Sequence, residues 1–332
     1  MGAILGRHAA VGLGLESTHG TAVSRTMWLR VMSVSNHLQQ IDRTPRQHSQ
    51  GPGVTHGGMP IAHTDGSITV SDLAFECSSY YNDDSIALFY AAMGAVADAG
   101  SGPSSYTHTF TLANTLPSWT IETIEGEDSN GDDSAVVTAG CVCSGLVWTI
   151  ESGGSTPSTL AVTFNGQKDA GDTTAGSPSF GSIDAPTMYY HIGDLSWNSI
   201  TIEKEFVRRI TVTLANGLSV DRFGVGTQYR EEPYLTGERS VTIEVMMERH
   251  QADALRASYT SGANSSLTFT LTSGSKTAAN TFHAARIMSF GRDIQIAGVV
   301  MQTVTFRAFA VPAGGNGWSL VVTNDVENYD GS

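Results

Sequence analysis

Two pairs of adjacent carboxylates are the residues best spaced for acid–base chemistry in this chain of 332 residues. Asp83-Asp84 and Asp132-Asp133 each offer two acids, and glycoside cleavage needs two carboxylates flanking one bond. The first pair, however, directly precedes a short apolar run, as a helix cap does, and the second pair lies in a polar loop. Neither pair therefore predicts a catalytic site.

The ten histidines and three cysteines form no metal-binding pattern. No HxH or HExxH spacing occurs, and no histidine lies near Cys141 or Cys143 in the sequence. With Cys77, the cysteines are too few for a disulfide framework, and Cys141 and Cys143 are poorly placed to pair with each other. We predict no metal, no other cofactor and synthesis in a reducing compartment.

Nucleotide-binding and nucleophile motifs do not occur either. Gly12-Leu13-Gly14 lacks the third glycine and the preceding strand of a dinucleotide fingerprint, and no serine has a Gly-x-Ser-x-Gly context before a helix. We expect Trp148 and Trp318 to be core aromatics instead of sugar-stacking platforms. The sequence predicts that the protein is not an enzyme.

The charge balance restricts the classes of partner. Eighteen basic against thirty-two acidic residues give a net charge of −14, which argues against gripping nucleic acid by neutralising its phosphates. No secretory signal is evident at the start of the chain. The longest mainly apolar run, Ile86 to Ala97, is shorter than the ~20 residues that span a bilayer, so we expect no membrane binding.

Alternating apolar and polar residues predict strands through most of the chain. In Gly140 to Glu151, for example, Leu146, Trp148 and Ile150 alternate with more polar neighbours. Gly193 to Ile202 is also expected to be one strand. Two short helices are expected, one capped by Asp83 or Asp84 and ending at Gly94, the other from about Ala252 to Tyr259. The predicted fold class is all-β with short helices.

One segment occurs twice, about half a chain apart. Pro60 and Pro233 are each followed by a polar turn containing glycine, and then by Ser67-Ile68-Thr69-Val70 in one copy and Ser240-Val241-Thr242-Ile243 in the other. A Gly-, Ser-, Thr- and Asp-rich stretch separates the copies. We predict two tandem β-sandwich or β-barrel domains, 1–180 and 181–332, with the boundary between 167 and 190.

Several short segments, in their order along the chain, resemble a known family. They are Val11-Gly12-Leu13-Gly14-Leu15-Glu16-Ser17-Thr18 before Trp28-Leu29, Ser67 to Val70 before a helix ending at Gly94, Gly140-Cys141 through Trp148 to Phe164-Asn165-Gly166, Thr211 to Leu218, and Thr305 to Ala308. The chain is similar in these segments to the major tail tube proteins of long-tailed bacteriophages. The resemblance implies two sheets packed near-orthogonally beside a short helix in each domain, with a long loop or hairpin arm.

The resemblance also implies a function. Subunits of that family form rings of six tube domains that stack into a hollow tail tube, through which double-stranded DNA passes on ejection. A duplicated chain favours trimeric rings with pseudo-six-fold symmetry, with hexameric rings as the second choice. Implied partners are the tape measure, tail terminator and distal tail proteins. The implied location is the virion tail, after synthesis in the host cytoplasm, and the family has no catalytic residues.

Two proline-bearing excursions, Gln39 to Thr64 and Leu218 to Thr236, are predicted to be inter-ring arms. We expect them to become ordered only against neighbouring rings, so that limited proteolysis of unassembled protein cuts there first. The arm candidates are Pro45, Pro52, Pro60, Asn216, Gly217, Pro233 and Tyr234.

An acidic turn runs from Glu125 to Asp133. Its carboxylates are Glu125, Glu127, Asp128, Asp132 and Asp133. They are expected either to repel DNA from the bore or to lie on a solvated outer loop, and charge runs usually face water. Two other classes stay open: a β-sandwich adhesin or carbohydrate-binding module, with exposed aromatics, and a β-rich hydrolase, with carboxylates converging in one cleft.

Overall fold

Strands dominate the computed structural model. It describes residues 10–35, 39–45, 63–70, 73–81, 83–100, 105–127, 133–152, 157–174, 176–180, 192–220, 222–225, 227–249, 252–293, 298–309 and 317–329. The helical elements are η2 (Asp84–Ile86), α1 (Ala87–Met93), η3 (Lys204–Phe206) and α2 (Ala252–Ser261). The strands are β1 (Ala10–Leu15), β2 (Met27–Ser35), β3 (Gln39–Pro45), β4 (His63–Val70), β5 (Leu73–Ser78), β6 (Gly94–Ala99), β7 (Tyr106–Leu112), β8 (Ser118–Glu127), β9 (Asp133–Glu151), β10 (Thr159–Asn165), β11 (Lys168–Thr174), β12 (Leu195–Trp197), β13 (Ile200–Ile202), β14 (Val207–Ala215), β15 (Leu218–Ser219), β16 (Tyr234–Leu235), β17 (Ser240–Glu248), β18 (Asn264–Ser273), β19 (Lys276–Asp293), β20 (Met301–Ala308) and β21 (Trp318–Asn324). The predicted all-β class with short helices is confirmed.

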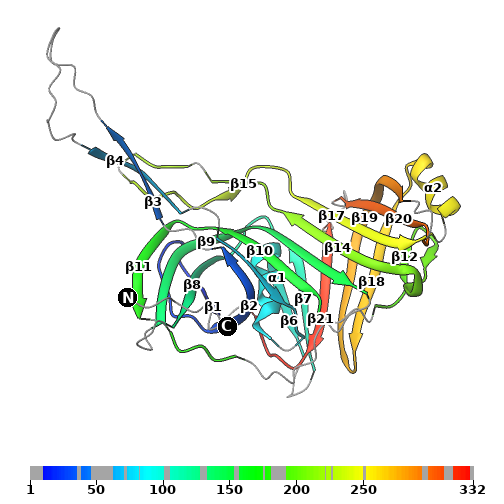
Figure 1. Ribbon diagram of the computed structural model, residues 1–332, viewed down its shortest axis with the longest axis horizontal. Helices are drawn as coiled ribbons and strands as arrows, with labels where there is room; N and C mark the ends of the chain where they lie inside the picture. The colour runs from blue at the N-terminus through cyan, green and yellow to red at the C-terminus, as the bar shows by residue number, and fades with distance from the viewer. Residues whose placement is uncertain are drawn as a thin grey trace, which may run out of the picture.

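Six strands of the N-terminal half close into a barrel, which we call unit one. Its antiparallel order is β1, β2, β5, β10, β9 and β8, and β8 pairs again with β1. Every strand therefore has a neighbour on both sides over at least part of its length, and the circuit is closed. The alternation of buried and half-buried residues along β5 and β10 places one face of each strand in the core. Figure 1 shows this barrel beside the group of strands from the other half.

The C-terminal half repeats this pairing order, and we call its strands unit two. Here β12 pairs with β13, η3 links β13 to β14, and β14, β17, β20, β19 and β18 follow in antiparallel order before β18 returns to β12. Strand β2 of unit one thus corresponds to β13, η3 and β14 together. Each unit also has a short helix after its third strand, α1 after β5 and α2 after β17.

Irregularities of the ladders coincide in the two units. The register shift next to Met32 in the β2–β5 ladder corresponds to the shift next to Arg208 in β14–β17. The shift at Ser144 in β9–β10 corresponds to the shift at Met288 in β19–β20. The β8–β9 and β18–β19 ladders share a third shift, between Trp119/Ile121 and between Ser265/Leu267. The two units therefore share their backbone geometry in detail.

The ladders correct the register of the sequence repeat. Gln39 pairs with Val70 in unit one, and at the equivalent position of unit two Ala215 pairs with Ser240. Ser240 therefore corresponds to Val70 and not to Ser67. Ser67 lies in β4, which forms a separate two-stranded sheet with β3. The two similar sequence segments are therefore offset by three residues from the positions that correspond in the structure.

A second sequence expectation also differs from the structure. Residues Gly193 to Ile202 were expected to be one strand, but they form the β12–β13 hairpin. Asn198 and Ser199 both have positive φ, of 49° and 62°, which is the backbone of a tight two-residue hairpin turn.

The two units share one hydrogen-bonded sheet and one core. Strand β9 of unit one pairs with β14 of unit two, and the β6–β7 hairpin pairs with β21. Phe89 of α1 packs edge-on against Trp148 and Trp318, with ring centroids 5.2 and 6.1 Å apart. Both tryptophans are fully buried, so the prediction that they are core residues is confirmed. The division into domains 1–180 and 181–332 stays a prediction.

Candidate assembly interface

The ladder between β9 and β14 joins the two units, and we call it the internal joint. It runs from Arg209 opposite Glu151 to Ala215 opposite Gly145. Two further backbone bonds extend it: Asn216 N–H donates to the Ser144 carbonyl at 2.9 Å, and Ser152 N–H donates to the Arg208 carbonyl at 2.8 Å. The joint is thus a complete antiparallel strand addition, with main-chain hydrogen bonds for most of its length.

A buried asparagine closes one end of the internal joint. The Asn216 side-chain amide donates to the carbonyls of Ala92, at 2.9 Å, and Cys143, at 3.0 Å. Ala92 lies in the last turn of α1 and Cys143 in β9, so one side chain of unit two caps two elements of unit one. A buried carbonyl that lacks a donor costs free energy, so these two bonds stabilise the contact between the units.

Arg239 completes this polar cluster. Its Nε donates to Asn216 Oδ1 at 2.8 Å, and its terminal nitrogens donate to the carbonyls of Ala113, Ala92 and Met93 at 2.5, 3.0 and 3.2 Å. Burial lowers the pKa of Arg239 to about 10, so the guanidinium is still charged at neutral pH. A cation at the C-terminus of a helix is favoured by the helix dipole, and α1 ends here with Gly94 in the left-handed region.

Glu16 fixes the bend of β9 within unit one. Its carboxylate accepts from the N–H groups of Gly20 and Gly140, at 2.8 and 2.9 Å, and from the hydroxyls of Ser118 and Thr120, at 2.7 and 2.8 Å. Gly140 has φ +69°, and a Cβ there would lie 2.5 Å from Gln167 Cβ. Glu16 belongs to the opening segment that carries the family resemblance, and the structure gives it a positioning role.

A comparison with known families agrees with this architecture. The family model described as phage tail tube protein matches residues 6–308 of the chain. The chain belongs to the phage tail tube protein family. Members are structural components of the virion, and the family implies self-assembly into a tube, association with other tail proteins and a place in the virion tail. None of the curated proteins compared with this tail tube protein matches it.

The predicted arm residues of the tail tube protein do not form one cluster. Pro45 ends β3 and pairs with His63, while Pro52 and Pro60 lie outside the described residues. Figure 1 shows β3 and β4 projecting from unit one. Asn216 is at the internal joint, and the Cβ position of Gly217 lies within 3 Å of the Gly237 backbone.

The second excursion lies against unit one. Gln167 Nε2 donates to the Arg230 carbonyl at 2.7 Å, and Pro233 lines a small cavity together with His19. Tyr234, in β16, is 48% exposed and stacks under Arg222. The role of both excursions as inter-ring arms stays a prediction.

The acidic turn is shorter than expected, because its ends are strands. Glu125 and Glu127 belong to the end of β8, and Asp133 begins β9 opposite Glu127. Asp128 and Asp132 lie outside the described residues. Whether these carboxylates face the bore stays a prediction.

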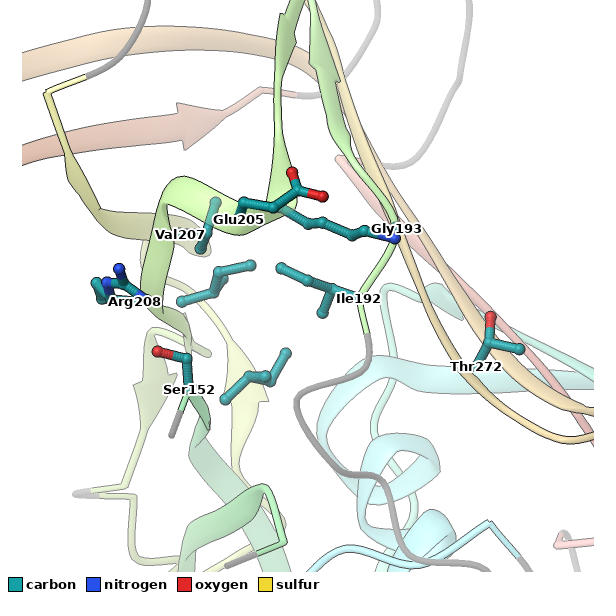
Figure 2. A pocket seen from close by; sticks show the side chains of 10 residues that line it. Ser152, Ile192, Gly193, Glu205, Val207, Arg208 and Thr272 are labelled. Carbon is teal, nitrogen blue, oxygen red and sulfur yellow. The ribbon is translucent and has the colours of Figure 1, made fainter. Parts of the chain in front are cut away.

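A cavity of about 620 Å³ opens beside the internal joint. Figure 2 shows Ile192 and Val207 facing its centre, whereas the charged ends of Glu205 and Arg208 point away. The apolar side chains of this cavity provide packing, and Glu205 and Arg208 do not converge on it as an acid–base pair. The absence of catalysis is nevertheless a prediction for the tail tube protein.

The described part of the chain holds no cluster of metal ligands and no membrane-spanning helix. No group of three or more His, Cys, Asp or Glu side chains is arranged there to hold a metal ion. All three cysteines are buried and unpaired, and burial raises the pKa of the Cys143 thiol to about 12. Neither α-helix of those residues is long and apolar enough to span a bilayer.

Proposed function

We propose that this protein polymerises into stacked rings that form the hollow tail tube through which phage DNA passes on ejection. The observation that carries the proposal is the repeated strand order of units one and two, joined head to tail by a strand addition. Repeating a head-to-tail joint by rotation closes a ring. Two units in each chain favour three chains per ring over six, and domains 1–180 and 181–332 would supply the two positions.

The excess of acidic over basic residues supports a tube through which DNA passes without being bound. A net charge of −14 provides no excess of cations to hold phosphates, and DNA carries one charge per ~1.7 Å of duplex. Repulsion acts only within a Debye length of about 8 Å at physiological salt, so it concerns residues at the wall. Reversing Glu125 and Glu127 to Lys should slow ejection if they face the bore, and an unchanged rate would place them outside.

Electron microscopy of the purified protein, with native mass spectrometry of single rings, tests the proposal. Tubes or rings of three chains are expected, with six similar lobes around each ring. Rings of six chains would support the tube and contradict the trimer. Dispersed monomers under all assembly conditions would contradict both, and glycan binding by those monomers would favour the adhesin class.

A further inference from the structure

A small cavity lies between unit one and the second excursion, and we call it the docking cavity. It is lined from unit one by His19, Gly140, Asn165, Gly166 and Gln167, and from the excursion by Val220, Arg230, Glu231 and Pro233. Its volume is about 10 Å³, which is enough for a single water molecule. The docking cavity is therefore too small for an organic ligand.

The bend of β9 leaves the space that the His19 ring occupies. A Cβ at Gly140 would lie 3.0 Å from His19 Cε1 and 3.2 Å from His19 Nε2, so a larger residue at the bend would displace the ring. The same Cβ would lie 2.5 Å from Gln167, whose Nε2 donates to the Arg230 carbonyl at 2.7 Å. The bend thus brings a histidine of unit one and an arginine of the excursion to one cavity.

The hydrogen bonds of unit one determine which nitrogen of His19 carries a hydrogen. Ser118 Oγ lies 3.0 Å from His19 Nδ1 and donates its own hydrogen to the Glu16 carboxylate, at 2.7 Å. Because a hydroxyl has one hydrogen, Ser118 can only accept from His19, so Nδ1 is the nitrogen that donates. In the neutral ring the other nitrogen, Nε2, is therefore an acceptor.

Two buried atoms at the docking cavity have no hydrogen-bond partner among the described residues. They are His19 Nε2 and Arg230 Nε. The first is an acceptor in the neutral ring, and the second is always a donor. A buried polar atom without a partner costs free energy, and a buried water relieves that cost where it finds two or more polar partners. A water molecule fits this cavity in size, and it can donate to one atom and accept from the other.

We propose that one buried water accepts from Arg230 Nε and donates to His19 Nε2, and that this bridge docks the second excursion on unit one while His19 is neutral. A protonated Nε2 would donate to the water, so the water would lose its acceptor on the ring. It would also place a second positive charge beside the Arg230 guanidinium. Both changes weaken the docking. The inference concerns the single chain and does not depend on the proposed function.

The surroundings of His19 favour the neutral ring. Burial has the largest effect and lowers the pKa of His19 from its usual value of 6.5, although Glu232 and Glu16 act in the opposite direction. The charged groups around the ring and the cavity are Glu16, Lys168, Arg230, Glu231 and Glu232. Because the pKa is lowered in the docked chain, docking is fully present above pH 6.5 and weakens as the pH falls below that value. Acid should therefore loosen the second excursion.

Hydrogen exchange of the unassembled protein tests the pH dependence. Peptides that cover residues 227–236 should lose protection at least ~3-fold between pH 7.5 and pH 5.5, after correction for the intrinsic exchange rate. His19→Gln has no ring to protonate and should show equal protection at both pH values. His283→Gln, in unit two, is the matched control and should keep the wild-type loss. Equal protection of the wild type at both pH values, or a wild-type loss in His19→Gln, would overturn the proposal.

The bridge itself is tested on the wild-type chain. Nitrogen NMR of protein labelled with ¹⁵N-histidine should show the neutral His19 ring with its hydrogen on Nδ1 at pH 7.5, and a crystal structure at better than about 2 Å should show one water within hydrogen-bond distance of His19 Nε2 and Arg230 Nε. A hydrogen on Nε2 in the neutral ring would contradict the assignment, as would the lack of a bridging water in the crystal. Neither result bears on whether the protein forms a tube, so the two proposals fail separately.

Discussion

Units one and two have the same strand order but are held by different side chains. At the bend of the long strand, unit one has Gly140 with φ +69° and the Glu16 carboxylate as its acceptor. Unit two has Ala284 with φ 48° at the same point. The strand ladder, with its irregularities, therefore determines the path of the backbone. The local side-chain contacts determine how strongly that path is stabilised in each unit.

The residues that close the internal joint differ from their counterparts in unit one in the same way. The internal joint is closed by Asn216 and Arg239, which satisfy carbonyls of α1 and β9. The ladders place Gln40 and Thr69 at the corresponding positions of unit one. The internal joint thus has a half-buried cation at a position where unit one has an uncharged residue.

The largest effect is expected at Arg239. Arg239→Gln should lower the free energy of unfolding by about 3–5 kcal/mol, because several buried carbonyls lose a charged donor. Urea unfolding followed by tryptophan fluorescence measures this. Arg307→Gln is the control, since its partner Glu238 is exposed, and it should cost under ~1 kcal/mol. Equal losses for the two variants would contradict the role given to Arg239.

The bend of unit one should be nearly as sensitive. Gly140→Ala should cost about 2–3 kcal/mol, because the added Cβ meets Gln167 at a positive φ. Gly145→Ala, five residues further along β9, meets only the Leu214 carbonyl at 3.4 Å and should stay within ~1 kcal/mol of wild type. Comparing the urea midpoints of the two variants shows whether stability depends on the bend at Gly140 or on any added methyl group in β9.

A pH-dependent difference is expected between two aspartates that each accept a hydrogen bond from a backbone N–H group. Trp28 N–H donates to half-buried Asp84, which begins η2, and Lys204 N–H donates to exposed Asp194, which precedes β12. Burial raises the pKa of Asp84 from 3.8 to about 6, so its protonated form favours folding below pH 4 and that contribution is lost as pH rises through 6. Asp84→Asn should therefore match wild type near pH 4 and be about 1–2 kcal/mol more stable at pH 7.

Asp194→Asn is the control for this pH profile. Because its hydrogen bond is exposed, the variant should follow the wild-type profile of stability against pH. Thermal unfolding from pH 4 to 7 is the measurement. If Asp84→Asn lost stability at pH 7, the buried carboxylate would be stabilising in its charged form and the stated direction would be wrong.

The smallest effect is expected at the bend of unit two. Ala284→Gly should raise the free energy of unfolding by about 0.5–1 kcal/mol, because glycine adopts a positive φ without a Cβ penalty. Ala285→Gly, at an ordinary φ, should lower it by about 1 kcal/mol. The two changes together show whether unit two carries the backbone strain that unit one avoids with Gly140.

The sequence pattern predicted many of the individual helices and strands, but it did not predict which strands pair with each other. Alternation identified most of the strands but not β1, β3, β6 or β11, and Asp83 with Gly94 marked the first helix correctly, because these signals are local. The β7–β21 and β9–β14 ladders join residues far apart in sequence, which no local pattern records. The β12–β13 turn was missed because Asn198 and Ser199 lie between apolar residues that alternate like one strand.

The candidate site was predicted only in part, for a physical reason. Asn216 was flagged as an arm residue because Asn-Gly is a turn signal, but its buried amide serves carbonyls of unit one. Arg239 carries no local signal, since an arginine beside a glycine turn usually faces water. Burial of such a cation depends on where distant carbonyls end up, and that is known only from the fold.

The three shared register shifts have a historical consequence. Met32 and Arg208, or Ser144 and Met288, have little in common as side chains, yet each pair occupies the same kink. Such kinks are conserved within families even where side chains change, so the three shared shifts are the observation that supports a gene duplication which the diverged side chains no longer show.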